Sequence, residues 1–278
     1  VGLFLMSNPL VLGLDFGGTK LAAGVVDLHT MQVVDSAFRS TQPERGGAGA
    51  FADMMALARD LKGAHTINAI GVSFGGYTLN NHILKSLHVA AWDNFPLQEQ
   101  VRPHFGDVPV YVANDANAVA LSEYRFGAGR GSKAMLFVTV STGVGGGVVL
   151  DGKLLEGSNG LAGEIGHFNA IPDNGPACPC GRNGCVEAIS AGPGMVKYAR
   201  RLLDVPDNDS VLRHLTDFTA RDINDCAHNG DELAIQVLQT GARYLGIAIG
   251  NAINLLDLDC VVIGGGVSRA GNIWWDAL

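Results

Sequence analysis

Short apolar runs that end in glycine open the chain, and longer helical patterns follow them. The run at 10–18, "LVLGLDFGG", predicts a buried strand followed by a tight turn. The alternating small and apolar residues at 19–28 predict the strand that returns from this turn, and 31–40 predicts a third. The apolar spacing over about 48–62 then predicts a helix.

The next two segments bring a polar pair to the end of a strand. Residues 67–76 predict another buried strand that runs into glycines, and 108–127 predicts a strand that continues directly into a helix. Asn114 and Asp115 lie at that junction. An aspartate that opens an apolar helical run is ordinarily an N-cap, so this role has to be weighed against a chemical one.

The pattern then begins again. Residues 134–155, "AMLFVTVSTGVGGGVVLDGKLL", predict strand, glycine-rich turn, strand, turn and strand, which is the layout of 10–40. Helices are expected from about 190, and a final strand at 258–268. We therefore expect two α/β halves, each opened by an antiparallel hairpin around a Gly-Thr turn, with a boundary near the helix at 115–127.

Composition indicates a compact globular protein. Of the 278 residues, 47% are hydrophobic and 17% are charged, and the net charge is -8. An acidic balance disfavours a nucleic-acid surface, which requires basic clusters. The most apolar long stretch, 234–256, contains Gln, Arg and Asn at intervals, which favours a buried amphipathic helix over a membrane span. The opening ten residues lack a basic region and an A-x-A site, so we expect no signal peptide and a cytoplasmic protein.

The glycine-rich turns fit neither of the common phosphate motifs. The chain has no G-x-x-x-x-G-K-[ST], and its glycine turns open strands where a dinucleotide-binding motif would open a helix. Taken alone, "DFGGT" indicates a hairpin turn. Asp15, at a strand end beside glycines, suits a magnesium ion held through water, and the turns at 141–147 and 264–266 offer further donors. Three such edges could enclose a nucleoside triphosphate.

Three of the five cysteines lie within "ACPCGRNGC" at 177–185. A disulfide, a redox pair, a nucleic-acid finger and a metal site are the alternatives. Clustered cysteines in a cytoplasmic protein more often bind metal than form disulfides. The absence of C-x-x-C disfavours a redox pair, and few basic residues lie near enough for a nucleic-acid finger. Cys226 and Cys260 are distant in sequence and are expected to be buried or inert thiols.

Six motifs occur in a fixed order: "LDFGGTK", "ANDANA", "STGVGGG", "LAGEIGH", "CPCGRNGCVE" and "VVIGGGVS". Together they resemble the ROK family (repressors, open reading frames, kinases) of sugar kinases, over essentially the whole chain from about residue 10. The resemblance implies an α/β, two-lobed actin-like (ribonuclease H-like) ATPase fold of the hexokinase type, with duplicated domains and a cleft between them. The domains would be 10–120 and 121–278, the second short of the family's last helices.

The resemblance implies transfer of the γ-phosphoryl group of ATP, with Mg²⁺, to a hexose hydroxyl, usually at C6. Asp115 would be the general base, because a sugar hydroxyl is a poor nucleophile until a carboxylate accepts its proton. The residues implied around the sugar are Gly76, Asn114, Asp115, Glu164, His167 and Glu187. Those implied at the phosphates and magnesium are Asp15, Gly17, Gly18, Thr19, Lys20, Thr142 and Gly143, and those along the adenosine are Gly264, Gly265 and Gly266.

The resemblance also implies a zinc site. Its ligands would be His167, Cys178, Cys180 and Cys185. Four protein ligands leave no open position, so the zinc would be structural. One ring nitrogen of His167 would bind the metal and the other a sugar hydroxyl. Glu187, two residues after Cys185, would be positioned by the same zinc site. On this basis Cys180→Ser should lose zinc and most kinase activity while leaving the ATP contacts largely intact.

Several alternatives remain open at this point. Glucose is the expected substrate, with N-acetylmannosamine, fructose and N-acetylglucosamine as others within the family, and "GVSFGGYTL" departs from the proline-containing loop common in it. A sugar-responsive repressor needs a DNA-binding segment, for which the first strand at about residue 10 leaves little room. A catalytically inactive sugar-binding protein is the third. The expected partners are a hexose and ATP, with no nucleic acid or membrane, and a homodimer or dimer of dimers, for which the helix at about 231–256 is a candidate interface.

Overall fold

The computed structural model describes residues 9–86, 92–206 and 208–278. The opening segment considered above as a signal lies mostly outside the described residues. The chain forms two compact units: unit 1 extends to Ala118 and also contains Glu156–Leu161, and unit 2 contains Val119–Leu155 and Ala162–Leu278. The chain therefore passes three times from one unit to the other. The predicted domains, 10–120 and 121–278, stay predictions.

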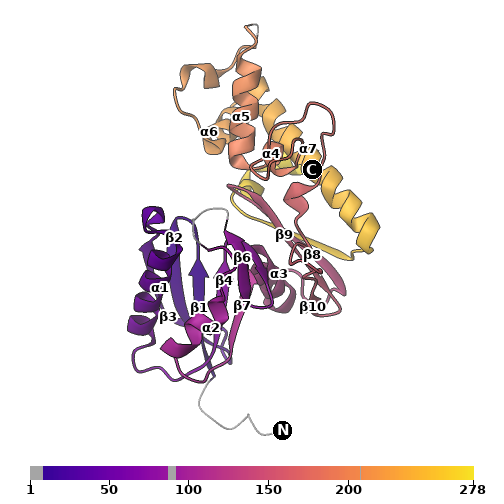
Figure 1. The fold of residues 1–278 in the computed structure, drawn as a ribbon. Helices are drawn as coiled ribbons and strands as arrows, with labels where there is room; N and C mark the ends of the chain where they lie inside the picture. The colour runs from indigo at the N-terminus through magenta and orange to yellow at the C-terminus, as the bar shows by residue number, and fades with distance from the viewer. Residues whose placement is uncertain (1–8, 87–91, 207) are drawn as a thin grey trace. The chain divides into compact units, whose positions relative to one another are not determined.

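Unit 1 is built on a mixed sheet whose strand order, in the described part of the chain, is β3-β2-β1-β4-β7 (Figure 1). β1 pairs antiparallel with β2 and parallel with β4, so the sheet combines a hairpin with a crossover. Helix α1 packs on β1, β2 and β3. The elements are β1 (Leu10–Phe16), β2 (Lys20–Asp27), β3 (Gln32–Ser40), α1 (Gly46–Lys62), β4 (Ile67–Phe74), β5 (Gly76–Leu79), β6 (His82–Ser86), α2 (Leu97–Val101) and β7 (Val110–Asn114).

The core of unit 1 follows from two periodicities. Alternate residues of β1, namely Leu12, Leu14 and Phe16, are buried, as the two-residue repeat of a strand requires. Helix α1 buries residues three or four apart, among them Met54 and Leu61, against the same core. The predicted strands at 10–18, 19–28, 31–40 and 67–76 and the helix at 48–62 are confirmed.

A second, small sheet in unit 1 was not predicted. β5 and β6 form an antiparallel hairpin closed by Asn80 and Asn81, whose φ angles are 51° and 64°. Two consecutive residues with positive φ are what a type I′ hairpin turn needs, and asparagine tolerates that region. The Asn-Asn pair in "TLNNHI" was therefore a hairpin signal in the sequence.

Unit 2 repeats the layout of unit 1. Its sheet has, within the described ranges, the order β10-β9-β8-β11, in which β8 pairs antiparallel with β9 and parallel with β11. The antiparallel hairpin predicted at the opening of each half is thus confirmed. The strands are β8 (Ala134–Val140), β9 (Val144–Leu150), β10 (Lys153–Leu154) and β11 (Cys260–Gly264).

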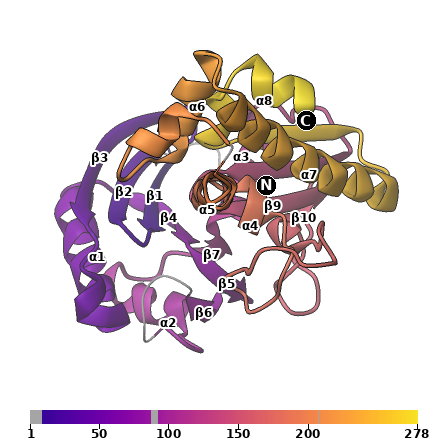
Figure 2. The ribbon, with the colours of Figure 1, turned by 90° about the horizontal axis from the view of Figure 1, so that it is seen from above.

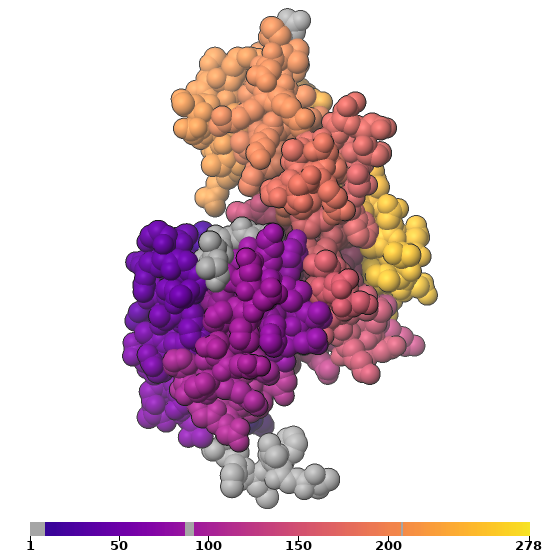
Figure 3. All heavy atoms as spheres, viewed as in Figure 1, coloured from indigo at the N-terminus to yellow at the C-terminus, as the bar shows by residue number. Residues whose placement is uncertain are grey.

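Helices pack on both faces of β8. Leu136 and Val138 contribute to a large core with α5 and α7, whereas Met135 and Phe137 pack with Ala120 of α3. Helix α7 also lies along α6 and α8 (Figure 2), and α5 contacts α6. The residues of these two helices fall in the orange part of the space-filling view (Figure 3). The helices are α3 (Asp115–Phe126), α4 (Glu187–Ser190), α5 (Gly192–Leu203), α6 (Ala220–His228), α7 (Glu232–Leu256) and α8 (Asn272–Ala277). Across residues 9–86, 92–206 and 208–278, no helix has the length and apolarity to cross a bilayer.

Candidate functional site

The polar pair predicted at a strand end lies where β7 passes into α3. The side-chain oxygen of Asn114 accepts the backbone N–H of Asn117 at 3.2 Å, which is the N-cap hydrogen bond of α3. Its Nδ2 donates to the carbonyl oxygen of Gly76 at 3.0 Å. Asp115 is exposed at the first helical position, and its Oδ1 accepts the N–H of Ala116 at 2.8 Å. The capping role considered for Asp115 therefore belongs to Asn114.

Gly76 is fixed by a close approach of backbone. A Cβ built on it would lie 2.5 Å from the carbonyl oxygen of Lys85 and 2.8 Å from the ring of Phe74. No larger residue fits there without a shift of β5 against β6. Because Asn114 bonds to the Gly76 carbonyl, two of the predicted sugar-binding residues are brought together in unit 1.

The first predicted phosphate turn is the connection between β1 and β2. The N–H of Gly17 donates to the carbonyl oxygen of Lys20 at 3.0 Å, and the hydroxyl of Thr41 donates to the Gly17 carbonyl at 2.7 Å. A Cβ on Gly17 would lie 2.7 Å from the Lys20 carbonyl oxygen, so the turn requires glycine. Asp15 and Thr19 are exposed beside it, and Gly18 is half-buried. The ammonium of Lys20 lies 5.7 Å from the centre of the Phe38 ring.

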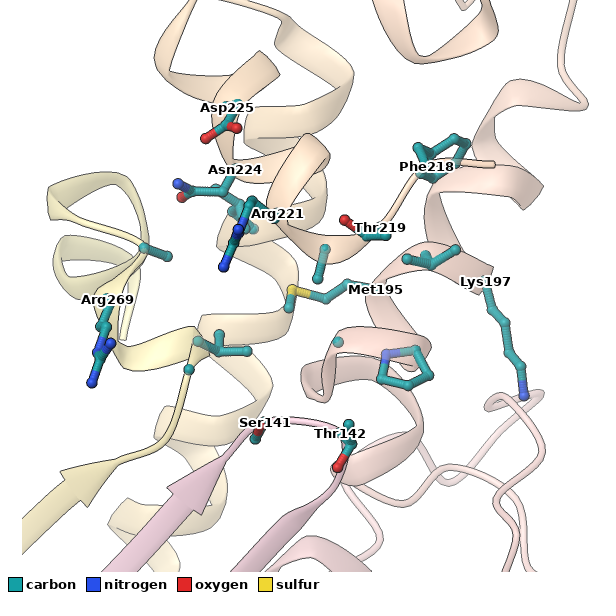
Figure 4. Close-up of a pocket in the computed structure, with 18 of the residues that line it drawn as sticks. Ser141, Thr142, Met195, Lys197, Phe218, Thr219, Arg221, Asn224, Asp225 and Arg269 are labelled. Atoms are coloured by element: carbon teal, nitrogen blue, oxygen red, sulfur yellow. The ribbon is translucent and has the colours of Figure 1, made fainter. Parts of the chain in front are cut away.

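A cavity of about 1030 Å³ lies within unit 2 (Figure 4). Ser141 and Thr142 of the β8–β9 turn line one end, and Arg221 and Asn224 of α6 lie across from them. Gly266, which follows β11, also lines it. Its apolar walls come from Met195, Val196, Phe218, Leu238 and Val267. The structure thus brings together two of the predicted nucleotide segments, and the walls from α5 and α6 were missed because no sequence motif marks them.

The glycines after β11 allow this approach. Gly265 has a φ of +91°, and a Cβ on it would lie 2.3 Å from the carbonyl oxygen of Val140. The chain therefore turns tightly beside the end of β8. Gly264 lies against the ring of Phe137, and Gly266 against the hydroxyl of Ser141.

The four predicted zinc ligands form one cluster in unit 2. His167, Cys178, Cys180 and Cys185 each place a ligand atom so that all four atoms lie within 4.8 Å of one another. The sulfurs of Cys180 and Cys185 are 3.6 Å apart, and Nδ1 of His167 is 3.7 Å from the sulfur of Cys178. A tetrahedral zinc with ordinary bond lengths sets sulfurs about 3.8 Å apart and sulfur and nitrogen about 3.6 Å apart. The residues therefore fit a structural zinc.

The thiols of this cluster titrate very differently. Burial raises the pKa of Cys178 to about 12, and burial is also the main cause that raises the pKa of Cys185. At Cys180, burial acts in the same direction but is outweighed by hydrogen bonds from the backbone and guanidinium of Arg182, which lower the pKa to about 7. Cys180 is the exposed member and the most readily ionised thiol of the three.

Two carboxylates adjoin the cluster. Nε2 of His167 lies 3.7 Å from Oε2 of Glu164, so its other ring nitrogen faces the cysteines. Glu187 begins α4, and its Oε2 accepts the backbone N–H of Val144 at 3.0 Å. Its Oε1 is 3.9 Å from the sulfur of Cys178. The residues predicted around the sugar therefore divide between the units, with Gly76, Asn114 and Asp115 in unit 1 and the other three in unit 2.

Comparison with known proteins places the chain in a family. The sequence model of the ROK family matches residues 11–278. The chain belongs to the ROK family. A glucokinase from Halalkalibacterium halodurans is 36% identical over 96% of this chain and 83% of its own length. An N-acetylmannosamine kinase from Escherichia coli is 39% identical over 93% of this chain and 84% of its own length.

Solved ROK structures share the fold. The ROK hexokinase from Thermus thermophilus covers 97% of this chain and 86% of its own, with 34% identity and a TM-score of 0.81. A ROK family glucokinase from Streptomyces griseus, solved with glucose and AMPPNP, covers 96% of this chain and 86% of its own, with 34% identity and a TM-score of 0.78. These likenesses confirm the predicted family and the α/β fold of actin-like ATPases. The roles of individual site residues remain predictions.

Proposed function

We propose that this ROK kinase transfers the γ-phosphoryl group of ATP to the 6-hydroxyl of a hexose, with glucose as the substrate and Asp115 as the general base. Two relatives named glucokinase, each 36% identical to this chain, support the reaction. The observation that carries the role of Asp115 is the capping of α3 by Asn114. Since the helix already has its cap, the carboxylate of Asp115 is not required for that purpose.

Asp115 would accept the hydroxyl proton as the phosphoryl group moves. A carboxylate in hydrogen-bond reach of a reacting hydroxyl contributes about 10² to 10⁴-fold in rate. Asn114 would orient the sugar from the same strand end, held in place by its bond to Gly76. Glu164, His167 and Glu187 would supply the contacts from unit 2, because carboxylates and imidazole can accept or donate hydrogen bonds to sugar hydroxyls.

The nucleotide would be held by backbone donors. Positioning and charge stabilisation account for most of the acceleration in phosphoryl transfer. Magnesium supplies neutralisation of the developing phosphate charge when bound, and Asp15 would hold it through water. Gly17, Gly18, Thr19 and Lys20 would contact the phosphates from unit 1, and Thr142 and Gly143 from unit 2. The adenosine would occupy the cavity in unit 2 beside Gly264, Gly265 and Gly266.

The zinc would have no part in the chemistry. Its four protein ligands fill a tetrahedral shell, so it would organise His167 and Glu187 as one wall for the sugar. His167 would bind the metal through Nδ1, the nitrogen that faces Cys178, and would present Nε2 to the sugar beside Glu164.

N-acetylmannosamine is the second candidate substrate. The observation that favours it is the 39% identity to an N-acetylmannosamine kinase, against 36% for the glucokinases over slightly more of the chain. We further propose a cytoplasmic homodimer, for which the exposed Ile247 and Leu255 of α7, 48% and 77% accessible, support an interface on that helix.

A coupled assay of ADP release against a panel of hexoses tests this function. Glucose should give the highest kcat/KM, and N-acetylmannosamine, N-acetylglucosamine, fructose and mannose complete the panel. Asp115→Asn should lower the sugar-dependent signal by about 10² to 10⁴-fold and serves as the control for contaminating kinases. A repressor or an inactive sugar-binding protein would release no sugar-dependent ADP, which would overturn the proposal.

A further inference from the structure

Glu187 contacts the backbone of the β8–β9 turn. Its predicted role as a sugar-binding residue does not explain this contact. Its Oε2 accepts the N–H of Val144 at 3.0 Å, at the first residue of β9. A Cβ built on Gly143 would lie 2.7 Å from the same oxygen, so the carboxylate lies directly against the turn. The turn is the one that carries Thr142 and Gly143.

Two further backbone hydrogen bonds hold the turn. The N–H of Ser141 donates to the carbonyl oxygen of Gly143 at 2.9 Å, and the N–H of Gly192, at the start of α5, donates to the Ser141 carbonyl at 2.9 Å. Both bonds hold Ser141, on the β8 side. On the β9 side, Val144 is held by Glu187, and a Cβ on Gly166 would lie only 2.0 Å from the Val144 carbonyl oxygen. The turn is therefore held on both sides, and the Glu187 carboxylate accepts the backbone N–H at the residue where β9 begins.

Three consecutive residues tie this carboxylate to the metal cluster. Cys185 belongs to the cluster, the N–H of Val186 donates to the carbonyl oxygen of Phe168 at 3.0 Å, and Glu187 reaches Val144. Ser190, at the end of the same short helix, is fully buried and donates to the carbonyl oxygen of Gly241 in α7 at 2.8 Å. The position of Glu187 is thus set by anchors on both sides of it.

We propose that Glu187 is a positioning residue for the phosphate-binding turn, through which the metal cluster holds that turn in place for the nucleotide. This rests on the proposed function, which assigns Thr142 and Gly143 to the phosphates. It changes one expectation stated above. Loss of the cluster should weaken nucleotide binding as well as sugar binding, because a displaced Cys185 moves Glu187 and releases the Val144 N–H.

Three substitutions distinguish the role of Glu187 as a hydrogen-bond acceptor from the effect of its negative charge. Glu187→Gln keeps the length and an oxygen that can accept the Val144 N–H, whereas Glu187→Ala removes the acceptor and Glu187→Asp shortens its reach. Glu164→Ala is the matched comparison, since it removes a carboxylate that also adjoins His167. Each variant is checked for folding by circular dichroism and for zinc by metal analysis.

The deciding readout is the affinity for MgADP, measured by calorimetry without sugar, followed by KM for ATP. Glu187→Ala and Glu187→Asp should bind MgADP about tenfold more weakly, as expected when the hydrogen bond that positions the turn is lost. Glu187→Gln and Glu164→Ala should bind it within about twofold of the unsubstituted protein, although both should raise KM for the sugar.

Two outcomes overturn the assignment: wild-type nucleotide affinity in a folded, zinc-containing Glu187→Ala, or an equal loss in Glu187→Gln. If Glu187→Ala fails to fold or to retain zinc, Glu187→Asp, which keeps the charge, decides by the same criterion. Binding of MgADP does not depend on which sugar is phosphorylated. A failure of the proposed function, seen as no ADP release by the unsubstituted protein with any hexose, is therefore distinguishable from a failure of this inference.

Discussion

Asn114 accepts the N–H of Asn117 at 3.2 Å and so caps the helix that Asp115 begins. From the sequence alone, either neighbour could cap the helix. In the structure Asn114 is the cap. Asn114 carries the structural task, because the same side chain also donates to Gly76 at 3.0 Å. Asp115 lies exposed beside it.

This division predicts opposite effects of two neighbouring substitutions. Asp115→Asn should lower kcat by about 10² to 10⁴-fold, because the base is lost. It should change the free energy of unfolding less than Asn114→Ala does, because the new amide oxygen can still accept the Ala116 N–H. Asn114→Ala should destabilise the protein by about 1 kcal/mol or more, because it removes the cap. Urea denaturation and steady-state kinetics on both variants check this. An Asp115→Asn enzyme with unchanged kcat would contradict the catalytic assignment.

The metal cluster predicts one zinc per chain. Cys178→Ser and Cys185→Ser should each lose the metal and lower the Tm, because a structural zinc contributes to folding directly. Cys226→Ser should retain the zinc and an unchanged Tm, since Cys226 lies outside the cluster of four. Metal analysis and thermal denaturation, with and without a chelator, measure the effect. Full zinc content in Cys178→Ser would contradict the ligand set.

Two adjacent glycines after β11 form a matched pair. Gly265→Ala should destabilise the protein by about 1 to 3 kcal/mol, because its φ is +91° and the new methyl group would lie 2.3 Å from the Val140 carbonyl oxygen. Gly266→Ala should be tolerated structurally, since its nearest neighbour to an added Cβ is the Ser141 hydroxyl at 3.8 Å. Equal losses in the free energy of unfolding for the two variants would contradict this account.

Asp231 gives a pH-dependent prediction. It caps α7 by accepting the Ala234 N–H at 2.9 Å, and it also accepts the Ser210 hydroxyl and the Val211 N–H, both at 2.7 Å. Burial alone would raise the pKa of Asp231, but these hydrogen bonds outweigh it and hold the pKa below its ordinary value.

A depressed pKa means that this stabilisation is present above the unfolded-state value, about 3.9, and is lost as the pH falls through the folded-state value. Asp231→Ala should therefore cost about 1 to 2 kcal/mol at pH 7, and the difference from the unsubstituted protein should shrink below about pH 4. Denaturation curves at several pH values measure it. A difference that stays constant down to pH 3 would contradict the role of the ionised carboxylate.

Several strands were predictable because apolar runs in the sequence end at glycines, which mark turns. The run before Gly17 and the run before Gly264 both predicted strands that the structure contains. The β5–β6 hairpin was missed because its strands are short, although Asn80 and Asn81 carried a turn signal. The four metal ligands were found through family resemblance, and the structure brings their ligand atoms within 4.8 Å of one another.

The rest of the site depends on contacts between segments far apart in sequence. The hydrogen bond from the Val144 N–H to the Glu187 carboxylate joins residues 43 positions apart and leaves no local pattern. The cavity of unit 2, proposed above as the nucleotide site, draws its walls from α5, α6 and the segment after β11, which are far apart in the sequence. Helical periodicity predicted that such helices exist but could not indicate which faces would line a cavity.

The short segment Glu156–Leu161 belongs to unit 1 although it follows β10 of unit 2. Its Gly160, with a φ of +68°, lies against the carbonyl oxygen of Thr78, where an added Cβ would approach to 2.3 Å. A ribosome must therefore synthesise β8, β9 and β10 before the last part of unit 1 emerges. Unit 1 therefore cannot complete its folding before part of unit 2 has been synthesised. A fragment that ends at Ala118 would lack the segment Glu156–Leu161, which lies against Thr78.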